Sequence, residues 1–299
     1  MKALPTLRQL QFFMTLARRG SFSKAADECL VSQSTLSSAV KELEGLIGQQ
    51  LVDRSTRAFA LTPAGEDVAA RAPAILAATE DLVDAASDRR PLEGDFTLGV
   101  IPTIAPFVLP KATRKMHDAF PKLELYLRED LTAALAERLT AGLIDAALLA
   151  FPYAIPGVEV IDVGEDPFWF ACSPDHPLAS RAKMTTQDLS AVKLLLLEDG
   201  HCLREHALDA CNLSQRGGAS SFDGTSLFTL TQMARTGLGA TLLPDMAIKN
   251  GLAKAAGLVA IPFKAPAPSR RIGVAWRKGS GRGDEAEAIA DVIRSVLSP

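Results

Sequence analysis

One predicted helix, residues 63–87, divides this chain of 299 residues into two dissimilar parts. Thr62 can cap the helix, and Pro63 suits its first position, where the missing N–H is harmless. Small and apolar residues then repeat in alternating steps of four and three, a heptad spacing suited to pairing with another helix; they are Val68, Ala72, Ile75, Thr79, Leu82 and Ala86. The alternative is that this helix packs on its own domain. Residues 89–94 are expected to form a hinge.

Beyond the hinge, predicted strands and helices alternate, which is the pattern of an α/β domain. Strands are expected at 95–101, 123–128, 145–150, 168–172, 193–197, 239–242 and 272–277. Helices are expected at 107–119, 132–141, 186–190, 203–211, 226–236 and 284–297. This order predicts two α/β units with a largely parallel sheet.

The part before residue 62 is predicted to be a small helical domain with a basic surface. Residues 1–61 carry eight Lys/Arg against five Asp/Glu, although the whole chain has a net charge of −3. A positively charged N-terminal part on an otherwise acidic chain is suited to contact with phosphate groups. Helices at 7–19, 24–29 and 33–47 form a helix-turn-helix pattern, which would place the third helix in the major groove of double-stranded DNA.

The start of the third helix carries the side chains expected to contact DNA, which are Ser32, Gln33, Ser34, Thr35 and, one turn later, Ser38. The Gln33 amide suits bidentate pairing with adenine. Two short predicted strands flank Arg54 and Arg57, and this wing would contact phosphates or the minor groove. The alternative is that residues 32–35 merely cap a surface helix.

The sequence shows no targeting segment. Arg8, Arg18 and Arg19 interrupt the apolar run that a secretory signal would need, and no apolar run reaches the roughly 20 residues of a membrane helix. We therefore expect a cytoplasmic protein without membrane contact. Permanent disulfides are rare in that compartment, and Cys29 and Cys172 are expected to be buried and inert.

The segment from Glu198 to Cys211 is the least ordinary part of the chain. After a turn at Gly200, Cys202 would begin a helix, and the helix N-terminus, His201 and Arg204 would favour its reactive thiolate form. Asp199 and Glu205 would work against it.

The spacing of Cys202 and Cys211 restricts how they could pair. Nine helical positions separate them by about 13 Å along the axis, whereas a disulfide joins Cα atoms at most about 7 Å apart. If the two do bond, the helix must unwind, and oxidation would be coupled to a large local change. One alternative is that Cys211 is an inert core thiol. Another is a metal site of His201, Cys202, His206 and Cys211, although no C-x-x-C pair supports it.

Several short motifs, taken together, closely resemble the LysR-type transcriptional regulators. They are Phe22-Ser23-Lys24-Ala25-Ala26, Val31-Ser32-Gln33-Ser34-Thr35-Leu36-Ser37, Leu43-Glu44 and Leu61-Thr62-Pro63-Ala64-Gly65. Ser34 is a departure, because the family often has proline there, but serine can also begin a helix.

This resemblance implies a fold and an assembly. The fold is an N-terminal all-α winged helix-turn-helix with a long linker helix, followed by a C-terminal α/β sensor like a periplasmic binding protein with two Rossmann-like subdomains. The expected limits are 1–62 for the DNA-binding domain, 63–89 for the dimerisation helix and hinge, and 90–299 for the sensor. Subdomain I would comprise 90–163 and 267–299, and subdomain II 164–266. Homodimers and homotetramers are implied, with RNA polymerase as a partner.

The segment from Glu198 to Arg204, followed by Cys211, further resembles the OxyR subfamily of hydrogen-peroxide sensors. The resemblance implies that Cys202 is the peroxidatic residue and Cys211 the resolving one. It also implies that Thr103, Thr132, His201 and Arg270 surround the reacting sulfur, where hydroxyls can hold peroxide oxygens and a cation can stabilise the thiolate. Cellular thiol reductants would reset the oxidised form. No metal or other cofactor is implied, and the chemistry is stoichiometric, so no enzyme is expected.

Two other functions stay open at this level. The chain could be a LysR-type regulator that responds to a small metabolite in the cleft between the sensor subdomains, where Thr103 beside a helix start could bind a carboxylate. It could also be a thiol enzyme of peroxiredoxin type, which the DNA-binding head disfavours.

Overall fold

The computed structural model describes residues 3–53, 59–85, 91–211, 223–224 and 226–297. These residues form two compact units, the first mainly within residues 1–87 and the second mainly within residues 88–299. Within these described ranges, no helix is both long and apolar enough to cross a membrane.

The first unit is a helical domain with a two-stranded wing. Its helices are α1 (Leu7–Arg19), α2 (Phe22–Glu28), α3 (Gln33–Ile47) and α4 (Pro63–Ala85), and β1 (Val52–Asp53) pairs antiparallel with β2 (Ala60–Leu61). A capping box of Thr6 and Gln9 begins α1, and Gly20, in the left-handed region at φ 61°, ends it. The predicted helix-turn-helix is confirmed, with α2 starting two residues early. Arg54 and Arg57 lie outside the described residues.

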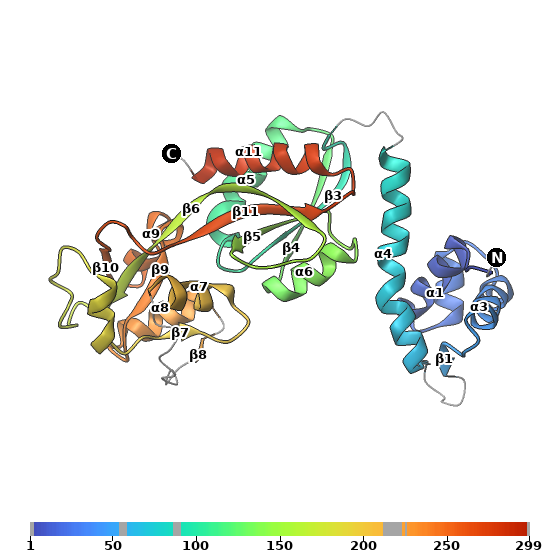
Figure 1. The fold of residues 1–299 in the computed structure, drawn as a ribbon, viewed down its shortest axis with the longest axis horizontal. Coiled ribbons are helices and arrows are strands. Elements are labelled where there is room, and N and C mark those ends of the chain that lie inside the picture. Colours follow the sequence, from blue (N-terminus) through green and yellow to red (C-terminus); the bar gives the residue numbers. More distant parts are fainter. Residues whose placement is uncertain (1–2, 54–58, 86–90, 212–222, 225, 298–299) are drawn as a thin grey trace. The chain divides into compact units, whose positions relative to one another are not determined.

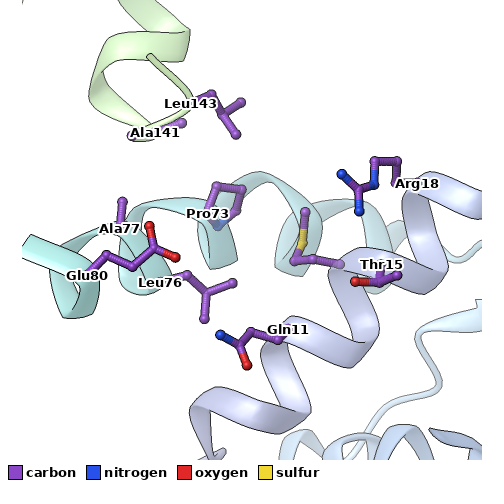
Figure 2. A pocket seen from close by; sticks show the side chains of 11 residues that line it. Gln11, Thr15, Arg18, Pro73, Leu76, Ala77, Glu80, Ala141 and Leu143 are labelled. Carbon is purple, nitrogen blue, oxygen red and sulfur yellow. The ribbon is translucent and has the colours of Figure 1, made fainter. Parts of the chain in front are cut away.

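The long helix α4 divides its apolar residues between two environments. Ala72 is buried and Leu76 packs against the core that α1 contributes to, and Figure 2 shows Leu76 of α4 near Gln11 of α1. On another side of the same helix, Ile75 and Leu82 are 49% and 70% exposed. The interpretation that this helix packs on its own domain therefore applies to Ala72, whereas pairing of the exposed residues with another helix stays a prediction. Ala86 lies outside the described residues.

The second unit is built on a seven-stranded sheet with the order β10-β6-β11-β5-β3-β4, in which β9 also pairs with β6. The strands are β3 (Gly94–Val100), β4 (Leu123–Glu129), β5 (Ala146–Phe151), β6 (Val158–Cys172), β9 (Thr241–Pro244), β10 (Val259–Pro262) and β11 (Ser269–Arg277). Only β4 and β5 pair parallel within this sheet, each with β3, so the expectation of a largely parallel sheet was wrong. The long strands β6 and β11 run antiparallel to each other through the unit (Figure 1).

Helices complete two lobes with separate cores. In the first lobe, α5 (Ala105–Ala119), α6 (Thr132–Thr140) and α11 (Gly283–Leu297) pack with β3 and β5. The second lobe contains η1 (Thr186–Ala191), β7 (Leu196–Leu197), α7 (Cys202–Ala210), β8 (Asp223–Gly224), α8 (Leu227–Arg235), α9 (Asp245–Lys249) and α10 (Leu252–Ala255). The predicted two-part α/β sensor is confirmed, while the exact limits of its subdomains stay predictions.

Candidate functional site between the sensor lobes

Cys202 lies at the start of α7, where this helix packs against β5 and β11. Gly200 makes the preceding turn at φ 97°, a left-handed conformation that favours glycine. His201 is the N-cap residue, but its side chain makes no capping hydrogen bond. Cys202 is only 5% exposed and packs into the core of the first lobe, although the rest of α7 belongs to the second. The sulfur is therefore held where the lobes meet.

Arg270 of β11 is the charged group of this site, and it is 1% exposed. Its Nε donates to Asp166 Oδ2 at 3.0 Å, and its Nη1 donates to Thr103 Oγ1 at 2.8 Å. A further Nη2 hydrogen bond of 3.1 Å reaches the Thr103 carbonyl oxygen. Asp166 in turn accepts the Met246 N–H at 3.0 Å. This network fixes a buried guanidinium in one orientation and leaves it few conformations.

Thr132, the first residue of α6, supplies a hydroxyl beside Cys202. It is close enough to hydrogen-bond to a Cys202 thiolate, which works to lower the thiol pKa. The same Oγ1 is buried and makes no hydrogen bond of ordinary geometry within the described residues. Buried hydroxyls are normally paired, so this one suits a bound polar molecule or a thiolate.

Burial is the largest influence on Cys202 and raises the pKa of its thiol. Arg270 opposes burial most strongly, followed by Thr132, whereas the Glu205 carboxylate raises the pKa further. The expected contribution of Arg204 was wrong, because its Nη1 donates to the Leu197 carbonyl oxygen at 3.0 Å and its Nε pairs with Asp199 at 3.1 Å. The cation that favours the thiolate comes from a distant strand.

His201 is 6% exposed and adjoins Cys202 in the chain. Burial lowers the pKa of its imidazole, and the Glu198 carboxylate partly opposes this. The ring is therefore neutral at pH 7 and supplies no positive charge to the thiol, contrary to expectation. Arg270 and Thr132 thus act on Cys202 directly. Thr103 is connected to it through its hydrogen bonds with Arg270, and a direct role for Thr103 at the sulfur stays a prediction.

Cys211 is the C-cap residue of α7, 2% exposed in the core of the second lobe. Burial raises its pKa to about 12. The residues between the two cysteines are helical, so the predicted separation of about 13 Å applies, and both thiols are free. Cys172 is also buried, with a pKa raised by burial to about 11, whereas Cys29 is only half-buried, contrary to expectation. In the described ranges, no three His, Cys, Asp or Glu side chains gather as metal ligands.

The candidate DNA-contacting residues of α3 are exposed: Ser32, Gln33, Ser34, Thr35 and Ser38. Ser32 is the N-cap residue and accepts the Thr35 N–H at 3.1 Å, and its hydroxyl also lies 2.8 Å from that of Ser34. The Ser32 side chain thus caps the start of α3. Gln33 is exposed in the first turn of α3, and its contact with the major groove stays a prediction.

Sequence reasoning missed Asp166 and Met246, which hold Arg270. A signal for Asp166 was available, because Asp166, Phe168 and Phe170 occupy every second position of β6 and are all buried. A carboxylate on the inward side of a strand needs a buried cation. Met246 gave no comparable signal, since it contributes a backbone N–H to Asp166 and a thioether sulfur 3.8 Å from Arg270 Nη2, and apolar methionines are common in cores.

Family models match both units of the chain. Residues 7–66 match the model "Bacterial regulatory helix-turn-helix protein, lysR family", and residues 89–298 match the "LysR substrate binding domain". The chain belongs to the LysR family. This LysR-family protein is therefore a DNA-binding transcriptional regulator rather than an enzyme, as its sequence predicted.

Individual relatives match this LysR-family regulator over nearly its full length. The regulator EstR of Acinetobacter baylyi is 38% identical over 299 residues, covering 100% of this chain and 99% of the relative. A probable hydrogen peroxide-inducible genes activator of Streptomyces viridosporus is 40% identical, covering 98% and 95%. A solved structure of a full-length OxyR variant from Pseudomonas aeruginosa has a TM-score of 0.81 and 33% identity, covering 98% and 97%. The resemblance to the OxyR subfamily thus extends over nearly the whole chain.

Proposed function

We propose that this LysR-family regulator senses hydrogen peroxide through Cys202 and changes its action on promoter DNA through a Cys202–Cys211 disulfide. The observation that carries the proposal is the surroundings of Cys202. The fixed guanidinium of Arg270 and the buried hydroxyl of Thr132, which has no other partner among the described residues, both act on one buried thiol. The relatives named as peroxide-inducible activator and OxyR support the choice of oxidant.

The first step oxidises the sulfur of Cys202. Its thiolate attacks one peroxide oxygen, the O–O bond breaks, and the products are a sulfenic acid and hydroxide, which takes up a proton to become water. Arg270 stabilises the thiolate and the departing hydroxide, while the Thr103 and Thr132 hydroxyls hold the peroxide oxygens. Neutral His201 adds a further hydrogen-bonding group.

The second step joins the two cysteines. The Cys211 sulfur attacks the Cys202 sulfenic sulfur, the S–O bond breaks, and the leaving oxygen departs as water with the Cys211 proton. Because α7 keeps the sulfurs apart, this step requires α7 to unwind. A cellular dithiol then supplies two electrons and restores both thiols. The rebuilt segment would alter how protomers of a dimer or tetramer sit on DNA and meet RNA polymerase.

The proposal is tested by treating the reduced protein with about one equivalent of hydrogen peroxide, blocking free thiols, and mapping disulfides by peptide mass spectrometry. We expect a Cys202–Cys211 link that is lost in Cys202→Ser, together with a changed DNA footprint. Unmodified thiols at both positions would remove the peroxide proposal and leave a small metabolite as the signal. Sustained peroxide consumption with a thiol donor would instead indicate peroxidase turnover.

A further inference from the structure

His206 is a buried side chain to which the proposed chemistry gives no role. It follows Cys202 by four positions in α7, so the two side chains share one face of the helix. It is 6% exposed, and its Nε2 lies 3.0 Å from the carbonyl oxygen of Pro152. Pro152 directly follows β5 of the first lobe, whereas the body of α7 packs with the second. This His206–Pro152 contact joins the two lobes on the helix between the cysteines.

The contact also fixes the state of the imidazole. A carbonyl oxygen only accepts hydrogen bonds, so Nε2 carries the hydrogen and donates it. Burial lowers the pKa of His206, and Arg270 acts in the same direction, whereas Pro152, Glu205 and Asp209 oppose them. The ring is therefore neutral at pH 7, and its Nδ1 is buried without a hydrogen-bond partner among the described residues. The ring is held by one hydrogen bond, at Nε2.

Among the polar contacts of α7, the Thr132 hydroxyl of the first lobe lies beside Cys202 at the start of the helix. No side chain caps the helix start at His201. Arg204 binds the Leu197 carbonyl oxygen and Asp199, both next to β7 in the second lobe. When α7 unwinds, these two Arg204 contacts can move with their own lobe, but His206 must leave the end of β5.

We propose that the His206–Pro152 contact holds α7 closed against the first lobe and thereby sets how readily Cys202 and Cys211 meet. His206 is a positioning residue in this role, since it acts on the sulfurs through the helix. That the His206–Pro152 contact holds α7 closed does not depend on the peroxide proposal. Only its effect on the rate of disulfide formation rests on the proposed function. Losing the donor leaves a carbonyl oxygen unpaired in the closed form, which favours opening.

Two variants separate the hydrogen bond from the packing. His206→Leu fills much of the same space without a donor, whereas His206→Gln keeps an amide that can reach Pro152. The measurement is hydrogen exchange of the amides of residues 203–211 in the reduced, full-length protein. We expect exchange roughly 2- to 10-fold faster in His206→Leu, the range for one net hydrogen bond, and within 2-fold of wild type in His206→Gln.

Equal exchange in wild type and His206→Leu would overturn the inference, whatever peroxide does. Should His206→Leu fail to fold, His206→Asn replaces it, because its shorter amide removes the contact with less change in polarity. We expect hydrogen exchange to be faster in His206→Asn by the same factor, and exchange equal to wild type would overturn the inference.

The consequence is tested with the two oxidation steps measured separately. In a Cys211→Ser background, sulfenic acid formation should stay within about 2-fold of wild type for both variants, while with Cys211 present disulfide formation should be roughly 2- to 10-fold faster in His206→Leu. A slower first step with an unchanged second step would contradict the assigned role. Failure of every variant and of wild type to oxidise would remove the peroxide function, and the exchange result would still decide the role of His206.

Discussion

At the scale of single residues, the Thr132 hydroxyl lowers the stability of the fold but favours the reactive form of Cys202. Its hydroxyl is buried and unpaired within the described part of the chain, yet it acts to favour the Cys202 thiolate. An unpaired buried hydroxyl costs about 1–3 kcal/mol of stability. Thr132 thus costs the reduced protein some stability and contributes to the reaction of Cys202, a trade-off that is common at functional sites.

Thr132→Val removes this hydroxyl at nearly constant shape. We expect the free energy of unfolding to stay equal or rise by about 1 kcal/mol, while the rate of Cys202 oxidation by peroxide falls about 10-fold or more. Urea unfolding and sulfenic acid trapping measure the two quantities, and Thr132→Ser, which keeps the hydroxyl, is the matched control. A destabilised variant that oxidises at the wild-type rate would show that Thr132 serves only the fold.

Cys211 makes stability depend on alkaline pH. Its pKa is about 12 in the folded protein, because burial disfavours the thiolate, whereas a thiol in an unfolded chain titrates near 8.5. The folded state therefore keeps a proton that the unfolded state loses. The contribution of the protonated Cys211 thiol to the free energy of unfolding is therefore complete below about pH 8.5 and is lost as pH rises toward 12.

The corresponding prediction compares reduced wild type with Cys211→Ser at pH 8 and pH 10.5. Between about pH 9 and 10.5, the free energy of unfolding of wild type should fall more steeply, by up to about 1.4 kcal/mol per pH unit. Lysines and tyrosines titrate in both proteins and cancel in the difference. Parallel curves would show that Cys211 is ionised or exposed in the folded state.

At the scale of elements, the sequence predicts the ordinary helices well and the sheet less well. Strong periodicity and explicit caps placed α1 and α3 at their observed limits. The first half of β6 was missed because its residues 158–167 contain four acids, whose side chains interrupt an apolar pattern. Without that half, the antiparallel pairing of β6 with β11 could not be foreseen, and a parallel sheet was expected.

The site was foreseen only as far as its residues are chemically conspicuous. Motif resemblance selected Thr132 and Arg270, which act on Cys202 from α6 and β11, and Thr103, which binds Arg270. It could not select the backbone partners of Arg270 and His206, because a carbonyl or an N–H is present at almost every residue. Nor could the sequence show which arginine favours the Cys202 thiolate, since the choice between Arg204 and Arg270 depends on where the fold places each guanidinium.

The stability of α7 itself should control the second oxidation step. Glu205 is an exposed helical residue between the cysteines, and Glu205→Gly should weaken the helix by about 1 kcal/mol relative to Glu205→Ala. Both variants remove the same charge near Cys202, so their first-step rates should agree. Disulfide formation should be about 5-fold faster with glycine. Equal rates for the two variants would mean that α7 need not unwind.

At the scale of the whole molecule, a change at α7 must reach the segment that leads to α4. β5 offers a direct connection within the second unit, since Pro152 follows its last residue and Asp145 precedes its first. Asp145 pairs with Arg282 at 3.1 Å, and Arg282 pairs with Glu285 at 2.7 Å. Glu285 Oε1 then accepts the Leu92 N–H at 3.2 Å, two residues before β3 begins. This chain of contacts attaches the start of the sensor to the strand beside α7.

Glu285→Ala should therefore separate sensing from response. The substitution frees the Leu92 backbone but leaves Cys202 and its neighbours untouched, so peroxide should oxidise Cys202 at the wild-type rate. The difference in promoter affinity between reduced and oxidised protein should shrink about 5-fold, a loss of about 1 kcal/mol of coupling. The control is Glu287→Ala, on the same helix, where the side chain is 56% exposed and pairs with Arg294. If both variants keep the full difference in affinity, the signal leaves the sensor by another route, and contacts between protomers become the place to look for it.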